Sequence, residues 1–280
     1  MTEKAILINS YSQLKYFKRN KFSRIYWGVE FCQNLFPSLS DTKKIINFCC
    51  CNRIEFTLIT PFFTGKNIDK LRNTILLLRK QRKRYEVVVN DWGSIYLLNR
   101  EFSGKFTLSL GRLLTRQQRD PFMQLFINKQ KILPIKKSDG RIVVIFHEVN
   151  KKFLKAMQSS YVGTEYFFRL AKKLKIDRVE LNNLVQGVNL NSISLKKTLY
   201  YPFVNISTGR FCPMDTPNQR KFRIGVCKKD CLGYYDILKP NDLGFPLFKR
   251  GNTTFYKIPL KAELIKGSAD RTVFQPELPF

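Results

Sequence analysis

The sequence is poor in histidine, the side chain that most hydrolytic and many metal-dependent enzymes use. Its single histidine is His147, which excludes any mechanism that needs two imidazoles, such as that of the His-Glu-x-x-His zinc hydrolases. A serine or cysteine nucleophile activated by histidine would have to depend on His147 alone. His147 is therefore kept as a candidate catalytic proton carrier, with a strand-end histidine bonded to the backbone as the alternative.

Long apolar runs are also absent. The longest stretches, such as Ile75–Leu78 and Ile142–Phe146, fall far short of the roughly 20 residues that cross a bilayer. Met1–Lys21 contains no apolar run of signal-peptide length. We therefore expect a cytoplasmic protein with no membrane partner. In that compartment the seven cysteines are expected to be core residues, metal ligands or reactive thiols rather than a disulfide framework.

Acidic residues are scarce relative to basic ones. The chain has 21 Asp and Glu against 50 Lys and Arg, which gives a net charge of +29. One interpretation is a polyanionic partner, RNA above all, contacted by the clusters Arg79–Arg84 and Lys15–Lys21. The other is a coding bias that also enriches Asn, Ile and Phe, with each cluster a solvated helix end or loop.

Alternating β-like and helical runs predict an α/β protein. The 280 residues, 44% of them hydrophobic, suffice for one core, and we treat residues 1–280 as a single domain. Strand–helix alternation favours a parallel sheet, and roughly eight strands indicate a single irregular TIM-like β/α barrel with short antiparallel strands near the C-terminus. The predicted strands are Arg24–Glu30, Arg53–Thr60, Tyr85–Val89, Lys105–Leu110, Arg141–Phe146, Asp177–Leu181 and Leu199–Ser207, the last interrupted by Pro202. The predicted helices cover Asn67–Lys83, a short run ending at Asn99, and Gly163–Lys175, and the antiparallel pieces cover Tyr234–Leu260, with turns at Asn241-Asp242 and Gly251-Asn252.

Polar residues that follow predicted strands are candidates for a rim site, because barrel chemistry sits at the carboxyl ends of the strands. Asp91 follows one strand and Arg112 the next, and both are kept as candidate catalytic residues. Asp91 has an equal alternative as a helix N-cap. Arg112 and Arg119 can grip a carboxylate or phosphate, or one of them can form a structural pair with Asp120.

Three cysteines near the C-terminus have a spacing that suggests metal ligation. Cys212, Cys227 and Cys231 form a Cys-x14-Cys-x3-Cys arrangement, and a spacing of four predicts that two thiols share one side of a helical turn. With one distant cysteine they would supply four thiolates, which suit tetrahedral zinc or a 4Fe-4S cluster. Structural zinc sites usually contain two pairs of closely spaced ligands. Only Cys227 and Cys231 are closely spaced here, which favours the 4Fe-4S cluster. The run Cys49–Cys51 is interpreted as inert buried residues.

Several segments together resemble the collagenase-like peptidase family U32. They are Ile25–Cys32, Glu86–Gly93 and Gly111–Leu114, combined with the C-terminal cysteine pattern. Within that family they are most similar to the cluster-bearing branch of anaerobic ubiquinone biosynthesis. The resemblance implies a barrel-like fold and a 4Fe-4S cluster held by Cys32, Cys212, Cys227 and Cys231. It also implies dioxygen-independent hydroxylation, and for some relatives an RNA substrate or a heterodimer with a paralogue.

Three hypotheses follow. The first is an iron–sulfur protein of the hydroxylation type, either an oxidoreductase or its cluster-carrying subunit. The second is a basic RNA-binding or RNA-modifying protein with a structural metal site, for which zinc replaces the cluster. The third is a peptidase, for which His147 is the one available imidazole base and no nucleophile motif is present.

Overall fold

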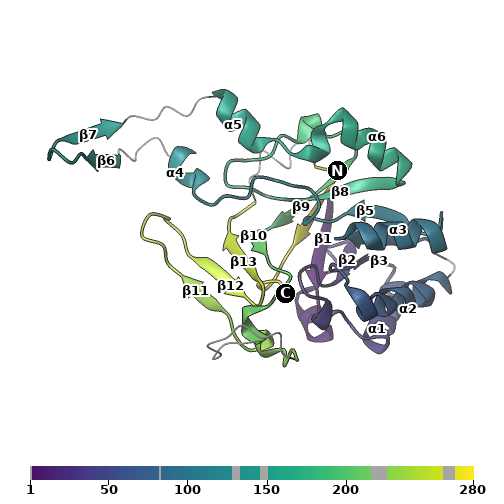
Figure 1. Cartoon of the computed structure of the whole chain (residues 1–280). Helices are drawn as coiled ribbons and strands as arrows, with labels where there is room; N and C mark the ends of the chain where they lie inside the picture. The colour runs from purple at the N-terminus through teal and green to yellow at the C-terminus, as the bar shows by residue number, and fades with distance from the viewer. Residues whose placement is uncertain (1, 82, 128–132, 146–150, 216–225, 261–268) are drawn as a thin grey trace.

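Eight parallel strands close into a barrel in the computed structural model, which describes residues 2–81, 83–127, 133–145, 151–215, 226–260 and 269–280 (Figure 1). Around the barrel the strands follow the order β1-β14-β9-β8-β5-β4-β3-β2, with β2 paired to β1. The barrel strands are β1 (Glu3–Ile8), β2 (Arg24–Gly28), β3 (Glu55–Ile59), β4 (Glu86–Val89), β5 (Thr107–Leu110), β8 (Ile176–Asn182), β9 (Lys196–Tyr201) and β14 (Arg271–Phe274).

Alternate residues of each strand face opposite sides of the barrel wall. Ile25 and Trp27 of β2 belong to the outer core, which packs against the helices, whereas Tyr26 belongs to a smaller inner cluster. The inner face also carries charge: Arg271 of β14 pairs with Glu86 of β4 at 2.5 Å. Period-two alternation thus separates an apolar outer layer from a partly polar lumen.

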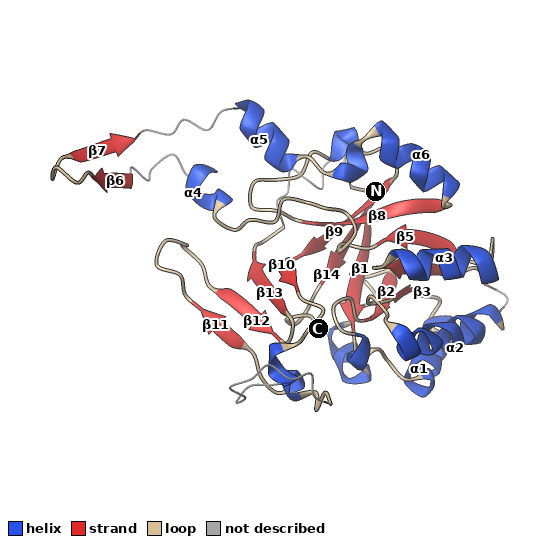
Figure 2. Cartoon of the chain, viewed as in Figure 1, coloured by secondary structure: helices blue, strands red, loops and turns tan. Residues whose placement is uncertain are grey.

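Helices cover the outside of the barrel (Figure 2). They are α1 (Leu39–Cys51), α2 (Ile68–Arg79), α3 (Trp92–Glu101), α4 (Met123–Ile127), α5 (Lys151–Gln158) and α6 (Glu165–Lys173), with short 3-10 helices at Tyr11–Tyr16, Gln33–Leu35, Gly65–Asn67, Tyr161–Gly163, Leu190–Ser192, Pro213–Asp215 and Asp230–Leu232. Ser38 caps α1 and Thr164 caps α6 by accepting backbone N–H bonds, which defines where these helices begin. Among the described residues, no helix combines the length and the apolar character needed to cross a bilayer.

A second, antiparallel sheet is inserted between β9 and β14. It has the order β10-β13-β12-β11 and stands beside the barrel (Figure 1). Its strands are β10 (Phe203–Thr208), β11 (Asp236–Leu238), β12 (Leu247–Arg250) and β13 (Thr253–Lys257). A separate hairpin, β6 (Leu133–Lys136) with β7 (Ile142–Ile145), extends away from the barrel. The predicted barrel with short antiparallel strands near the C-terminus is therefore confirmed.

Two of the predicted strands are placed differently by the structure. Arg141–Phe146 was expected among the barrel strands, but β7 pairs antiparallel with β6, because the long segment between β5 and β8 leaves the barrel before returning. Leu199–Ser207 divides at Pro202 into β9 of the barrel and β10 of the second sheet. The barrel also contains β1 and β14, which sequence reasoning missed. Helix α1 was also missed.

Candidate functional site

The carboxyl ends of the barrel strands bring together polar residues that are far apart in the sequence. Glu30 follows β2, Arg112 follows β5 and Asn182 ends β8. Arg112 contacts both of the others, donating from Nη1 to Asn182 Oδ1 at 3.0 Å and from Nε and Nη2 to the Glu30 carboxylate. Arg112 therefore lies at the strand-end rim where the sequence predicts it, together with Glu30 and Asn182.

Arg112 is completely enclosed. Its side chain has 0% exposure and that of Glu30 has 1%. Nη1 also donates to the Phe203 carbonyl at 3.1 Å, and the guanidinium lies 4.2 Å from the centre of the Tyr200 ring. Each side-chain nitrogen of Arg112 donates to a protein acceptor. The bond to the Phe203 carbonyl, at the start of β10, joins the barrel to the second sheet. Arg112 is therefore placed to support the rim rather than to bind a substrate carboxylate or phosphate.

Asp91 takes the alternative role foreseen for it. Its carboxylate accepts from the Ser94 backbone N–H at 2.7 Å and from the Phe63 N–H at 3.3 Å, so it is the N-cap of α3. Asn90 instead binds the strand ends, donating to the Thr60 carbonyl at 2.9 Å and accepting from the Leu113 N–H at 3.1 Å. Both residues serve local architecture. His147 lies outside the described residues.

Arg119 does not form the structural pair with Asp120 that the sequence allowed, since Asp120 caps the adjacent turn by accepting from the Phe122 N–H at 2.9 Å. Burial, followed by the nearby charge of Arg112, lowers the pKa of the Arg119 guanidinium to about 10. Its Nη1 is buried without a hydrogen-bond partner.

The four predicted ligand cysteines lie on three segments of the chain that approach one another beside the barrel. Cys32 follows β2, Cys212 follows β10, and Cys227 and Cys231 lie in the loop before β11. Burial raises the pKa of the Cys32 thiol, and Cys227 and Cys212 add to this rise. Burial also raises the pKa of Cys231 to about 11, with further contributions from Cys32, Cys212 and Cys227. Each of these interactions falls off with distance, so the early thiol lies near the late three.

The turn between β12 and β13 holds the three cysteine segments in place. Arg250 donates from Nε to the Cys231 carbonyl and from Nη2 to the Leu232 carbonyl, both at 3.0 Å. Asn252 donates from its amide to the Phe31 carbonyl, next to Cys32, at 2.8 Å and to the Gly209 carbonyl, three residues before Cys212, at 2.6 Å. Two side chains of one turn thus connect all three segments.

Gly251, between these two residues, leaves space beside the thiols. It has a φ of +56°, and a Cβ built on it would lie 3.7 Å from Cys231 Sγ and 3.8 Å from Cys212 Sγ. The cysteine donor set and this clearance suit a thiolate-ligated centre. Within the described part of the chain, however, no three Cys, His, Asp or Glu side chains stand in an arrangement ready to hold a metal ion. Binding would therefore require the thiols to move closer together.

Two expectations about cysteine placement are wrong. Cys49 is buried, as expected, but Cys50 and Cys51 are exposed, because successive positions of α1 point in directions about 100° apart. Cys227 and Cys231 do not share a helical turn: Cys227 precedes Lys229, which has a φ of +63°, and only Asp230–Leu232 is helical. Sequence reasoning also missed Arg250 and Asn252, although it predicted the turn at Gly251-Asn252.

Comparisons with known proteins find distant structural similarity only. No family model matches the chain, and no curated protein matches it. Among solved structures it is similar to the U32 peptidase Mk0906, with a TM-score of 0.41 and 11% identity over 100% of this chain and 95% of that one. It is also similar to the chitinase ChiW from Paenibacillus sp. str. FPU-7, with a TM-score of 0.38 and 7% identity over 97% of this chain and 40% of that one. Similarities this distant assign no activity.

Proposed function

We propose that this protein carries a 4Fe-4S cluster on Cys32, Cys212, Cys227 and Cys231 and takes part in dioxygen-independent hydroxylation, as the cluster-bearing branch of the U32 family does. The observation that carries the proposal is the approach of an early cysteine to three late ones across the rim of the barrel. Cys32 and Cys212 are 180 positions apart in the sequence, yet Cys212 adds to the rise in the pKa of the Cys32 thiol.

The surroundings of the thiols support a thiolate centre. The backbone N–H groups of Asn34 and Leu35 lower the pKa of the Cys32 thiol and so work against the effect of burial, and the Arg250 cation favours the thiolate form of Cys231. Donors and cations near sulfur stabilise the negative charge of a four-thiolate cluster and raise its reduction potential. A bound cluster supplies one-electron transfer.

The chain's own residues set the conditions for loading. Because burial raises the pKa of Cys32 and of Cys231, these thiols hold their protons near neutral pH in the absence of metal. Metal ligation requires thiolates, so loading releases protons and is expected to improve as the pH rises. Arg250 and Asn252 position the three ligand-bearing segments while this occurs.

Anaerobic purification followed by iron and acid-labile sulfide analysis tests the proposal. We expect about four irons and four sulfides per chain, and loss of both in Cys227→Ala and in Cys231→Ala. Cys50→Ala is the matched control and is expected to retain them, because this exposed thiol lies on α1, in a different part of the barrel. Stoichiometric zinc without sulfide would remove the cluster and favour the structural zinc site instead.

RNA binding is a second candidate, favoured by a basic hollow at the amino ends of β4 and β5. The hollow has a volume of about 290 Å³, and its lining includes Arg79, Lys83, Arg84 and Lys105. Lys83 pairs with Glu55 at 2.6 Å and Arg84 donates to the Phe106 carbonyl at 3.1 Å. The remaining two cations have no ion pair within the described structure, so they are available for phosphates.

Salt-dependent binding to a single-stranded RNA tests this second candidate. Replacing Arg79 and Lys105 by Gln is expected to reduce the slope of log K against log salt by about 1.4 if each contacts one phosphate. The control variant replaces Lys151 and Lys155 of α5. An equal change in both variants, or no binding near physiological salt, would contradict it. The same samples, analysed by sedimentation with and without a paralogous subunit, test the heterodimer that the family resemblance implies.

A further inference from the structure

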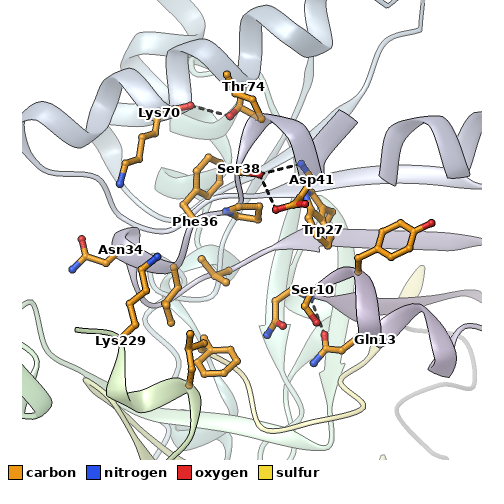
Figure 3. A pocket seen from close by; sticks show the side chains of 18 of the residues that line it. Ser10, Gln13, Trp27, Asn34, Phe36, Ser38, Asp41, Lys70, Thr74 and Lys229 are labelled. Atoms are coloured by element: carbon orange, nitrogen blue, oxygen red, sulfur yellow. Dashed lines mark hydrogen bonds between the residues drawn. The ribbon is translucent and has the colours of Figure 1, made fainter. Parts of the chain in front are cut away.

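A cavity of about 800 Å³ opens beside the cysteine site (Figure 3). Its walls come from the ends of β1 and β2, from the start of α1 and α2, and from the loops that carry Cys32 and Cys231. Asn34, Lys229 and Leu232 line it, and each is within two residues of one of those cysteines. The volume lies in the range of small-molecule sites.

The floor of this cavity is apolar and aromatic. Trp27 is 1% exposed, and Val29 and Phe36 are also buried. The Trp27 indole N–H is already bonded to Thr42 at 3.1 Å, so the floor presents no free indole donor to a ligand. A flat hydrocarbon body fits such a floor better than a sugar or a peptide backbone.

The mouth of the cavity carries two lysine ammonium groups. Lys70 of α2 and Lys229 line it, and neither ammonium group forms an ion pair within the described part of the chain. In Figure 3 both lie with the Asn34 amide on one side of the pocket. Lys229 holds a left-handed backbone conformation with a φ of +63°, which is uncommon for a residue with a Cβ.

The other charged residues of the lining are already occupied. Arg250 donates to three backbone carbonyls, including that of Leu278 at 2.8 Å. Glu277 accepts from Gln13 at 2.7 Å and from Tyr16 at 2.8 Å.

Asp41, the second carboxylate of the lining, accepts from Ser38 Oγ at 2.7 Å and lies 3.7 Å from Lys44 Nζ. An incoming anion would therefore meet two cations that have no ion pair among the described residues, whereas both carboxylates already have partners.

We infer that this cavity binds a small organic anion with an aromatic or otherwise flat apolar body, its charge between Lys70 and Lys229 and its apolar body toward the floor at Trp27, Val29 and Phe36. The ligand would lie beside the cysteine loop. The inference extends beyond the proposed cluster and does not require it, because none of the residues that recognise the ligand is a proposed metal ligand.

Tryptophan fluorescence can report binding in this cavity, because the chain has only two tryptophans, Trp27 and Trp92. In a Trp92→Phe background, Trp27 is the remaining tryptophan, and an aromatic probe held in the cavity that it lines quenches its emission. The probe is 8-anilinonaphthalene-1-sulfonate, a fluorescent aromatic anion, compared with its neutral analogue N-phenyl-1-naphthylamine. Both are titrated into anaerobically purified protein, before and after removal of bound metal, so that absence of a cluster leaves the measurement intact.

We expect the anionic probe to quench Trp27 and to bind more tightly than the neutral one. Replacing Lys70 and Lys229 together by Gln should weaken the anionic probe about five- to tenfold, as two exposed ion pairs allow, and leave the neutral probe unchanged. The matched control replaces Lys80 and Lys173, which are exposed and outside the cavity. Lys80 lies about 15 Å along α2 from Lys70.

Three results would overturn the inference. One is binding of the anionic probe without quenching of Trp27, which would place the probe elsewhere. Another is equal weakening in the two double variants, which would reduce the effect to overall charge. The last is equal affinity of the charged and neutral probes, which would leave an apolar pocket with no preference for anions. All four lysines are exposed, so the variants are expected to keep the circular dichroism spectrum of the parent.

Discussion

Removing one partner of the buried Arg112–Glu30 pair should lower the free energy of unfolding far more than removing one partner of an exposed ion pair. Arg112→Met eliminates the contacts to Glu30, to Asn182 Oδ1 and to the Phe203 carbonyl. It leaves a carboxylate with 1% exposure without its counter-charge. An uncompensated buried charge costs about 3–5 kcal/mol, against a typical free energy of unfolding of about 5–15 kcal/mol.

The double variant separates the charge from the packing. When Glu30→Leu accompanies Arg112→Met, neither charge of the pair remains, and the double variant should be more stable than Arg112→Met alone. Urea unfolding followed by far-UV circular dichroism measures both variants. Arg169→Met is the surface control, because its pair with Glu165 is 77% and 68% exposed; it should match the parent. A loss below about 1 kcal/mol in Arg112→Met would refute the reasoning.

Three further perturbations follow from single side chains. Asp91→Ala should cost about 1–2 kcal/mol of unfolding free energy, measured in urea, whereas Asp91→Asn, an equally good N-cap, should cost less. Burial raises the pKa of Glu180 to about 7, so the stability this carboxyl contributes is present below its unfolded pKa near 4.5 and lost as the pH rises through 7. Relative to the parent, Glu180→Gln should therefore be more favourable at pH 8 than at pH 5, and a difference independent of pH would contradict this. Gly251→Val places a branched side chain beside Cys231 Sγ at a φ of +56° and should lower the iron content, whereas unchanged iron would show that the clearance is not needed.

The local pattern of the sequence determined the alternation of strands and helices, and its composition excluded some kinds of chemistry. Strand and helix periodicities depend on neighbouring residues, which is why Arg53–Thr60, Tyr85–Val89 and Asn67–Lys83 match β3, β4 and α2 closely. A lone histidine excludes two-imidazole mechanisms in any fold. The charge of +29 is likewise a property of composition alone.

Only the tertiary structure decided which side chains meet. Arg112 pairs with Glu30, 82 positions earlier, because β5 and β2 end on the same rim of a closed barrel, and neither periodicity nor spacing encodes that closure. The same closure brings Cys32 near Cys212, Cys227 and Cys231 and places Lys70 and Lys229 at one cavity mouth. Strand order and register act over the whole chain, so partnerships across the rim are fixed when the barrel closes.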